Sequence, residues 1–275
     1  MKIKIYDCIT FFQSNLLFEL RFHTLKNIVD HFVICEATKT HMGKPKKILF
    51  NLKKWKKYGE KIIFIRVDDL PKINPKGIKD YALLKIQMEK LFLGINNASN
   101  NDLIIFSDED EIPNPTKIKD FKSNLYKYGI FMQNMYNYKI NILNMTEGNQ
   151  NWPGSRICKK KYLKSFFDLR ILKIKNIHSP FWKFYKERSI QLIKNGGWHF
   201  TYLMSPKHIS NKIKNSAHSE FNNKQFNNIN NIKNKIKNLK DLFNRNYLFK
   251  KVNVDNSYPK YILVNMKKFQ KWIAK

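Results

Sequence analysis

The stretch from Leu103 to Pro113 reads Leu-Ile-Ile-Phe-Ser-Asp-Glu-Asp-Glu-Ile-Pro, and it decides which fold this chain can have. Its four leading apolar residues predict a short buried strand, because strands that are covered on both faces read as continuous apolar runs. Four carboxylates follow after a single serine, and the proline ends any regular continuation. Acidic side chains at the carboxyl end of a buried strand stand where open α/β sheets bind their ligands.

Asp108 and Asp110 form an Asp-x-Asp (DxD) motif, which predicts a site for a divalent metal and a diphosphate. Carboxylates this close repel one another unless a cation or hydrogen-bond donors lie among them. Mg²⁺ and Mn²⁺ prefer oxygen ligands, often one or two carboxylates together with substrate phosphates. A solvated acidic turn is the alternative for an isolated motif, and the strand in front favours the metal site. Removal of Asp110 is therefore expected to relieve repulsion and to leave the fold intact.

The first half of the chain alternates predicted strands with predicted helices. The strands are expected at residues 3–12, 31–36, 61–67 and 103–106, and the helices at about 14–28 and 81–95. This alternation predicts an α/β fold with a mostly parallel central sheet flanked by helices. The second and third strands end in Glu36 and in Asp68-Asp69, so one edge of the sheet is expected to gather these acids near Asp108.

The second half is less regular. Residues 129–143 predict a long strand or hairpin, 152–156 a loop, 206–215 a short helix, and 229–242 a surface helix. Gly196 and Gly197 are expected to let the backbone approach a ligand closely. No linker divides the chain, so we predict one domain over 1–275, with a nucleotide-binding half at about 1–115 and an acceptor half at about 116–275.

Composition limits the class of protein. The 275 residues include 43% hydrophobic side chains, enough for a large core, and three cysteines, an odd number without metal-ligand spacing. Buried reduced thiols favour a reducing cytosol. No signal peptide and no apolar run of about 20 residues is evident, so a soluble cytoplasmic protein is expected, with peripheral contact at the inner face of an anionic membrane as an extension of that expectation.

The net charge of +31, from 52 Lys and Arg against 21 Asp and Glu, calls for an anionic partner. Nucleic acid, an anionic membrane surface and an anionic substrate all satisfy it. The lysines are spread along the chain with many Asn and Ile, a pattern that coding bias can produce. A nucleic-acid-binding protein or a metal-dependent nuclease is therefore the alternative function, although the chain lacks a basic repeat interleaved with aromatics, which argues against a nucleic-acid partner.

Six blocks, in this order, are similar to glycosyltransferase family 17. They are residues 6–12, 36–45, 67–71, 107–113, 197–202 and 258–263. The resemblance implies a GT-A type fold, a nucleotide-sugar donor with UDP-N-acetylglucosamine as the leading choice, a divalent metal (Mn²⁺ or Mg²⁺), a glycan acceptor, and inversion at the anomeric carbon.

Such a transfer needs a neutralised diphosphate and a base for the acceptor hydroxyl. The expected metal ligands are Asp108, Asp110 and His199. The expected donor contacts are Thr10, Glu36, Asp68, Asp69, Asp108, Arg156 and Trp198. The expected base is Glu220, with Glu111 as its competitor.

Most of these roles have a plainer alternative. Strand-end capping or solvation explains Glu36, Asp68 and Asp69 equally well, and a surface salt bridge explains Arg156. Trp198 and His199 could be ordinary core residues, and Glu220 an N-cap. Glu109 points away from its two neighbours along an extended segment, so a structural or solvated role is expected for it.

Overall fold

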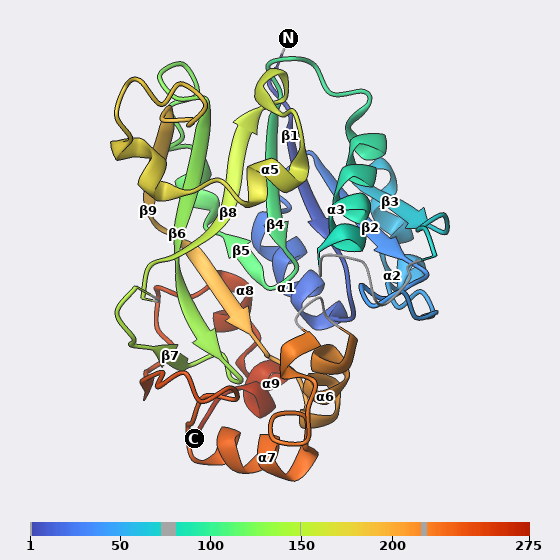
Figure 1. The fold of residues 1–275 in the computed structure, drawn as a ribbon, viewed down its shortest axis with the longest axis vertical. Helices are drawn as coiled ribbons and strands as arrows, with labels where there is room; N and C mark the ends of the chain where they lie inside the picture. The colour runs from blue at the N-terminus through green and yellow to red at the C-terminus, as the bar shows by residue number, and fades with distance from the viewer. Residues whose placement is uncertain (1, 73–80, 149, 216–218) are drawn as a thin grey trace.

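The computed structural model describes residues 2–72, 81–148, 150–215 and 219–275. Within these residues a mixed sheet of ten strands runs through the molecule, with helices on both faces (Figure 1). The strands are β1 (Ile5–Thr10), β2 (His31–Ala37), β3 (Ile62–Val67), β4 (Leu103–Asp108), β5 (Glu111–Pro113), β6 (Tyr128–Asn137), β7 (Ile142–Asn144), β8 (Trp152–Lys159), β9 (Ile190–Thr201) and β10 (Phe249–Lys251).

The α-helices are mostly short. They are α1 (Asn15–Leu25), α2 (Leu52–Trp55), α3 (Ala82–Glu89), α4 (Pro115–Ile118), α5 (Phe166–Arg170), α6 (Pro206–Asn215), α7 (Ile229–Lys237), α8 (Lys260–Val264) and α9 (Met266–Phe269). The 3₁₀ turns are η1 (Lys56–Lys61), η2 (Lys90–Ile95), η3 (Lys160–Tyr162), η4 (Ile174–His178), η5 (Ser219–Phe221) and η6 (Gln270–Trp272).

The four strands of the first half, in the order β4-β1-β2-β3, are parallel. Thr10 at the end of β1 therefore lies beside Asp108 on one strand and Cys35 on the other. The predicted α/β fold class, with a mostly parallel centre flanked by helices, is confirmed. All four of these parallel strands have their carboxyl ends at one edge of the sheet, so the segments that follow them leave from that edge.

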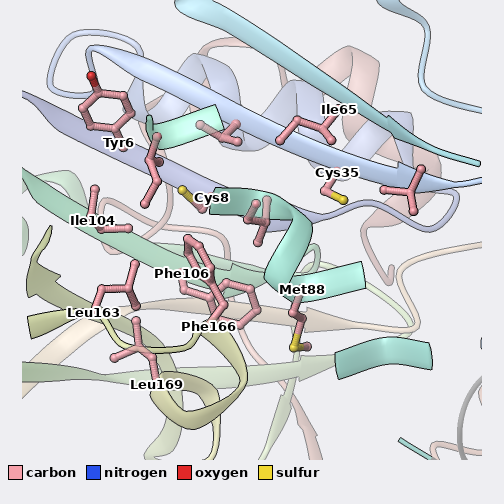
Figure 2. Close-up of a cluster of buried hydrophobic side chains, with 14 of the residues drawn as sticks. Tyr6, Cys8, Cys35, Ile65, Met88, Ile104, Phe106, Leu163, Phe166 and Leu169 are labelled. Atoms are coloured by element: carbon pink, nitrogen blue, oxygen red, sulfur yellow. The ribbon is translucent and has the colours of Figure 1, made fainter. Parts of the chain in front are cut away.

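Alternate residues of the parallel strands enter two separate cores, as the continuous apolar runs predict. Cys8 and Phe106 face α3 and α5 in the cluster of Figure 2. Ile9 and Ile105 face α1 and the ring of Trp55 on the other side. Both faces of the parallel sheet are thus covered. This packing holds in place the carboxyl ends of β1 and β4, from which the next turns leave the sheet.

Helix α1 begins where the sequence predicts. The Ser14 side chain caps it by accepting a hydrogen bond from the amide of Leu17 at 3.3 Å. Arg21 of this helix is fully buried and binds Asp7 of β1 with two hydrogen bonds, of 2.6 and 2.8 Å, and it also donates to the carbonyl oxygen of Glu111 at 2.5 Å. Helix α1 is therefore joined to β1 and to the acidic segment after β4.

The segment 152–156, predicted to be a loop, is instead the start of β8. This strand lies antiparallel between β4 and β6, and joins the two halves of the chain in one sheet. Pro153 and Gly154 suggested a turn, but a register shift in β6 after Ile130 accommodates them. Gly154 also allows close contact, since an added Cβ would lie 1.8 Å from Oε1 of Gln133.

The two glycines of β9, predicted to let the backbone approach a ligand closely, lie close against other strands. A Cβ on Gly196 would lie 2.7 Å from the amide nitrogen of Met132 in β6. A Cβ on Gly197, whose φ is +135°, would lie 2.1 Å from the carbonyl oxygen of Ile112 in β5. The glycines thus let β9 pair with β6 and β5 at once.

The predicted hairpin over 129–143 is confirmed as β6 and β7. The predicted helix 206–215 is confirmed as α6, which packs with α7 in a small separate core. The helix predicted over 229–242 ends at Lys237, so Leu239 and Leu242 follow it in irregular chain. None of the helices in the described residues has the length and apolar character needed to cross a membrane.

Candidate active site

A cavity of about 220 Å³ opens at the carboxyl ends of β1 and β4. Its described lining combines three carboxylates with two cations and two imidazoles. The lining residues are Thr10, Phe12, His41, Tyr81, Leu84, Asp108, Glu109, Asp110, Arg170, His199 and Lys212. They come from both halves of the chain, so the predicted gathering of acids is accompanied by cations from later elements.

Asp108 is held by Arg170, the last residue of α5. The guanidinium donates two hydrogen bonds to the carboxylate, of 3.1 Å from Nε and 2.7 Å from Nη2. Burial alone would raise the pKa of Asp108, but Arg170 outweighs it and keeps this pKa below its usual value. Asp108 is therefore a carboxylate anion in a paired state.

Asp110 lies between two cationic groups. Lys212 of α6 donates to its Oδ2 at 3.0 Å, and Nε2 of His199 lies 3.5 Å from its Oδ1. Burial opposes the charged form of Asp110, yet Lys212 and His199 lower its pKa well below the usual range. In return, Asp110 raises the pKa of His199 despite the burial of that ring. Nδ1 of His199 is buried and has no hydrogen-bond partner among the described residues.

Glu109 has the structural role expected for it. Its Oε2 accepts hydrogen bonds from the amides of Phe12, Gln13 and Ser14, at 2.9, 3.2 and 3.4 Å. Burial raises the pKa of this carboxyl group, although Lys212 and these amides oppose the change. Glu109 thereby fastens the turn after β1 to the turn after β4, and holds both against the cavity.

Glu111, predicted as a competitor for the base, does not line the cavity. Its two oxygens accept hydrogen bonds from the indole of Trp152 at 2.8 Å and from the amide of Asp108 at 3.3 Å. Burial and the nearby Asp108 raise its pKa. These contacts correct the prediction: Glu111 braces the acidic turn from behind.

Arg156, predicted as a donor contact or a surface salt bridge, is neither in the described residues. It is buried behind the cavity, where its Nη1 donates to the carbonyl oxygen of Pro153 and its Nε has no partner. Burial lowers its pKa, while Glu111 and Asp108 act in the opposite direction. Arg156 therefore places a positive charge near the carboxylates of Glu111 and Asp108 from a buried position in β8.

The acids after β2 and β3, three of the predicted donor contacts, are not among the residues that line this cavity. Glu36 is fully buried and accepts from the amides of Leu49 and Phe50 at 2.8 and 2.9 Å, as well as from Lys46. Asp68 pairs with Arg66, and Asp69 pairs with Lys90, both on the surface. Glu36 orders the segment after β2, which is the plainer alternative stated above.

Trp198 and Glu220 are likewise not part of this cavity. Trp198 packs in the core beside Ile112, and its indole donates to the carbonyl oxygen of Ser257 at 3.0 Å. Its neighbour His199 faces the cavity because successive side chains of a strand point to opposite faces. Glu220 is exposed in η5. Of the predicted donor contacts, Thr10 and Asp108 line the cavity.

Three basic side chains of the lining were not predicted, Arg170, Lys212 and His41, and neither were the aromatic and apolar lining residues Phe12, Tyr81 and Leu84. Nothing in the sequence distinguishes the first two among 52 Lys and Arg, because their partners are 62 and 102 residues away. His41 carried a weak signal, since it lies in the block at residues 36–45 that is similar to the family.

One ring nitrogen of His41, Nδ1, is unprotonated and can accept a hydrogen bond. The Gln87 amide nitrogen donates to the carbonyl oxygen of Cys35 at 3.1 Å, so its Oε1 must accept a proton from Nε2 of His41, 3.0 Å away. Nδ1 is then the unprotonated nitrogen. Burial lowers the pKa of His41, so the cavity holds one neutral imidazole, His41, and one that Asp110 favours as a cation, His199.

The donor set fits a divalent ion only in part. The described residues contain no group of three or more His, Cys, Asp or Glu side chains arranged as a metal site. Asp108 and Asp110 still place two carboxylates at one cavity. Since Mg²⁺ and Mn²⁺ are often held by one or two carboxylates plus substrate phosphates, the residues fit an ion that binds together with a diphosphate.

Two curated relatives share part of this sequence. The human and rat β-1,4-mannosyl-glycoprotein 4-β-N-acetylglucosaminyltransferases are each 29% identical to it over 106 residues, which is 35% of this chain and 19% of either relative. The aligned stretch thus spans about a fifth of the relatives' length.

Solved structures resemble the chain at low overall similarity. A 4-diphosphocytidyl-2C-methyl-D-erythritol synthase has a TM-score of 0.39 at 12% identity, and covers 70% of this chain and 89% of its own. Glucosyl-3-phosphoglycerate synthase from M. tuberculosis has a TM-score of 0.38 at 10% identity, covering 72% of each chain.

The decisive comparison is with a family model. The model of glycosyltransferase family 17 matches residues 1–270, nearly the whole chain and all the residues that line the cavity. The chain therefore belongs to glycosyltransferase family 17.

Proposed function

We propose that this chain transfers a sugar from a nucleoside diphosphate to a glycan acceptor, with UDP-N-acetylglucosamine as donor, a divalent metal as cofactor and inversion at the anomeric carbon. One observation carries the proposal: Asp108 and Asp110 stand at the end of β4 in a cavity that also holds Arg170 and Lys212. Carboxylates for a metal and cations for phosphates are thus combined at one place. The family supports the donor and the inverting course.

The cations can bind a diphosphate without leaving their carboxylates. Arg170 has five N–H donors and uses two of them on Asp108, so three remain for phosphate oxygens. Lys212 donates to Asp110 and has further protons on the same nitrogen. Such fixed charges stabilise the negative charge that develops on the leaving diphosphate.

Asp108 and Asp110 are the proposed metal ligands. When bound, a divalent ion supplies Lewis-acid stabilisation of the leaving group. His199 is proposed to orient Asp110 through its Nε2, 3.5 Å away, and to serve as a ligand itself once deprotonated. Thr10 at the end of β1, Phe12 just after that strand and His41 after β2 are proposed to hold the nucleoside, since they line the cavity on the side of the parallel strands.

The proposal is tested by a thermal-shift screen of nucleotide sugars with and without Mn²⁺. The proposed carboxylate ligands of the metal are Asp108 and Asp110, and the remaining ligands come from the diphosphate. Mn²⁺ alone should therefore have little effect on the melting temperature, whereas Mn²⁺ with UDP-N-acetylglucosamine should raise it. A ligand at roughly 100 times its dissociation constant adds about 2.7 kcal/mol. No response to any nucleotide sugar would refute the proposed donor site.

A pair of matched variants locates the effect. Asp110→Asn should abolish the Mn²⁺-dependent shift, because a carboxylate of the cavity is lost. Asp69→Asn is the control, since Asp69 is an exposed carboxylate that pairs with Lys90 on the surface. Equal responses of the two variants would place the metal and donor elsewhere.

A further inference from the structure

The segment between α5 and β9 carries exposed aromatic side chains. Residues 179–188, here called the aromatic loop, include four large rings that extend into solvent: Phe181, Trp182, Phe184 and Tyr185 are 68%, 61%, 82% and 81% exposed. In Figure 1 this yellow-to-gold segment lies at the upper left, at the opposite end of the molecule from α6 and α7. Exposed apolar patches of this kind usually mark an interaction surface.

The aromatic loop is held in shape by hydrogen bonds within the loop, one from a side chain and two between backbone groups. Arg188 donates to the carbonyl oxygen of Ser179 at 3.4 Å and so joins the two ends of the loop. Between them, the amide of Lys183 donates to Pro180 at 3.1 Å, and the amide of Lys186 donates to Lys183 at 3.0 Å. These turns present the rings at the tip.

The surroundings of the loop are cationic. Residues 171–189 contain five Lys and Arg against a single carboxylate, Glu187. That carboxylate lies 3.3 Å from Lys127 of the neighbouring turn, so it is already paired. A cavity of about 760 Å³ adjoins the loop, and its lining includes Phe184 and Tyr185 of the loop together with Lys161 and Lys164. An anionic partner therefore matches both the loop and the cavity.

We propose that the aromatic loop docks onto an anionic membrane surface, with its rings in the interfacial layer and its lysines at the lipid phosphates. Trp and Tyr concentrate in that layer, and lysine side chains extend from it to the head groups. Segments that combine apolar rings with cations bind anionic bilayers through both terms. The core of a protein–protein interface is instead depleted in lysine, which here lies among the rings.

The docking surface is separate from the candidate active site. No residue of the aromatic loop lines the cavity of Asp108 and Asp110 within the described chain. Docking through the loop thus leaves that cavity open, and the proposal does not depend on the transfer reaction.

The test is co-sedimentation of the full chain with vesicles of phosphatidylcholine alone and of phosphatidylcholine mixed equally with phosphatidylglycerol. The wild type should sediment with the mixed vesicles only, and its fluorescence should shift to the blue, a shift that Trp182→Phe should reduce. Phe184→Ser with Tyr185→Ser should weaken partitioning into the vesicles roughly tenfold or more, because two rings that enter the interfacial layer on docking are lost. Lys183→Glu with Lys186→Glu should weaken it by a similar factor.

A matched control separates docking from net charge. Lys53→Glu with Lys56→Glu makes the same charge change at exposed positions outside the loop, and should bind vesicles nearly as well as the wild type. The proposal is overturned if the wild type ignores the mixed vesicles, if the serine variant binds as tightly as the wild type, or if the control loses as much as the loop variants. Self-association that the serine variant abolishes, without vesicle binding, would overturn it in favour of a second copy as partner.

Discussion

At the scale of single residues, Asp110 is the best test of the site. The acidic run suggested that repulsion dominates at this position, so that removal of Asp110 would leave the fold unharmed. The structure shows the reverse balance, since Lys212 and His199 lower the pKa of Asp110 and hold it in its charged form. Removal would leave the buried His199 and the half-buried Lys212 without their anionic partner.

We therefore expect Asp110→Asn to abolish transfer and also to lower the free energy of unfolding by roughly 1–3 kcal/mol. The loss is limited because Lys212 keeps partial access to water. Urea denaturation measures the stability and product formation measures the activity. A double variant, Asp110→Leu with Lys212→Met, should recover stability and stay inactive; unchanged stability in Asp110→Asn would contradict the ion-pair account.

At this scale the sequence predicted some residues of the cavity and missed or misplaced others. Asp108 and Asp110 could be found because a buried strand and the acids that follow it are neighbours in the chain. Glu36 and Trp198 were misplaced because sequence does not say whether a residue at a strand end faces the cavity or the core. Arg170 and Lys212 act across the fold, and a lysine-rich composition conceals them.

At the scale of elements, β9 shows how close packing positions a side chain. Gly197 pairs with Pro113 of β5, and His199, two residues later, pairs with Glu111. The distance between these strands thus sets the distance of His199 from Asp110. The conformation of Gly197 is one that other residues rarely adopt.

Gly197→Ala should lower the free energy of unfolding by more than about 1 kcal/mol and reduce activity as well, because the added Cβ would push β9 from β5. Gly148→Ala is the control, since Gly148 also has a positive φ, of 81°, but has open space around it. Thermal denaturation and activity measure both variants. If the two lose the same stability, strain at φ and not the contact with Ile112 is responsible.

Helix α1 depends on a buried ion pair. Arg21→Met leaves the carboxylate of Asp7 buried without its partner, so we expect a loss of roughly 3–5 kcal/mol. Arg21→Met with Asp7→Leu removes both charges and should recover most of the loss, measured by urea denaturation. A double variant as unstable as the single one would show that the contact of Arg21 with the Glu111 carbonyl matters more than the pair.

Elements were predicted best where local signals agreed. Ser14 begins α1 and Pro206 begins α6, because capping chemistry and apolar spacing coincide there. The start of β8 was missed because Pro153 and Gly154 favour a turn locally, and only the shifted pairing with β6 makes them a strand. The α/β class followed from alternation alone, whereas the strand order of the second half depends on contacts distant in sequence.

At the scale of the whole molecule, the three cysteines report on the integrity of the core. All three are free and buried, and burial raises the pKa of Cys35 and of Cys158 to about 12 and that of Cys8 well above its usual value. We expect a thiol reagent at pH 8 to modify none of them in the native protein and all three in urea. Rapid modification of one thiol without urea would show that this core opens locally.

The placement of β8 has a consequence for synthesis on the ribosome. Strand β4 lies between β1 and β8, so it keeps an open edge until residue 159 has emerged. The wait is longer for Asp108 and Asp110, which remain without their cationic partners until Arg170 and Lys212 are synthesised, 62 and 102 residues later. At usual rates of translation the longer wait lasts about 5 to 20 seconds. During that interval the nascent chain presents a half-paired strand edge followed by acids without their cations, and a translational pause before residue 212 would prolong that state.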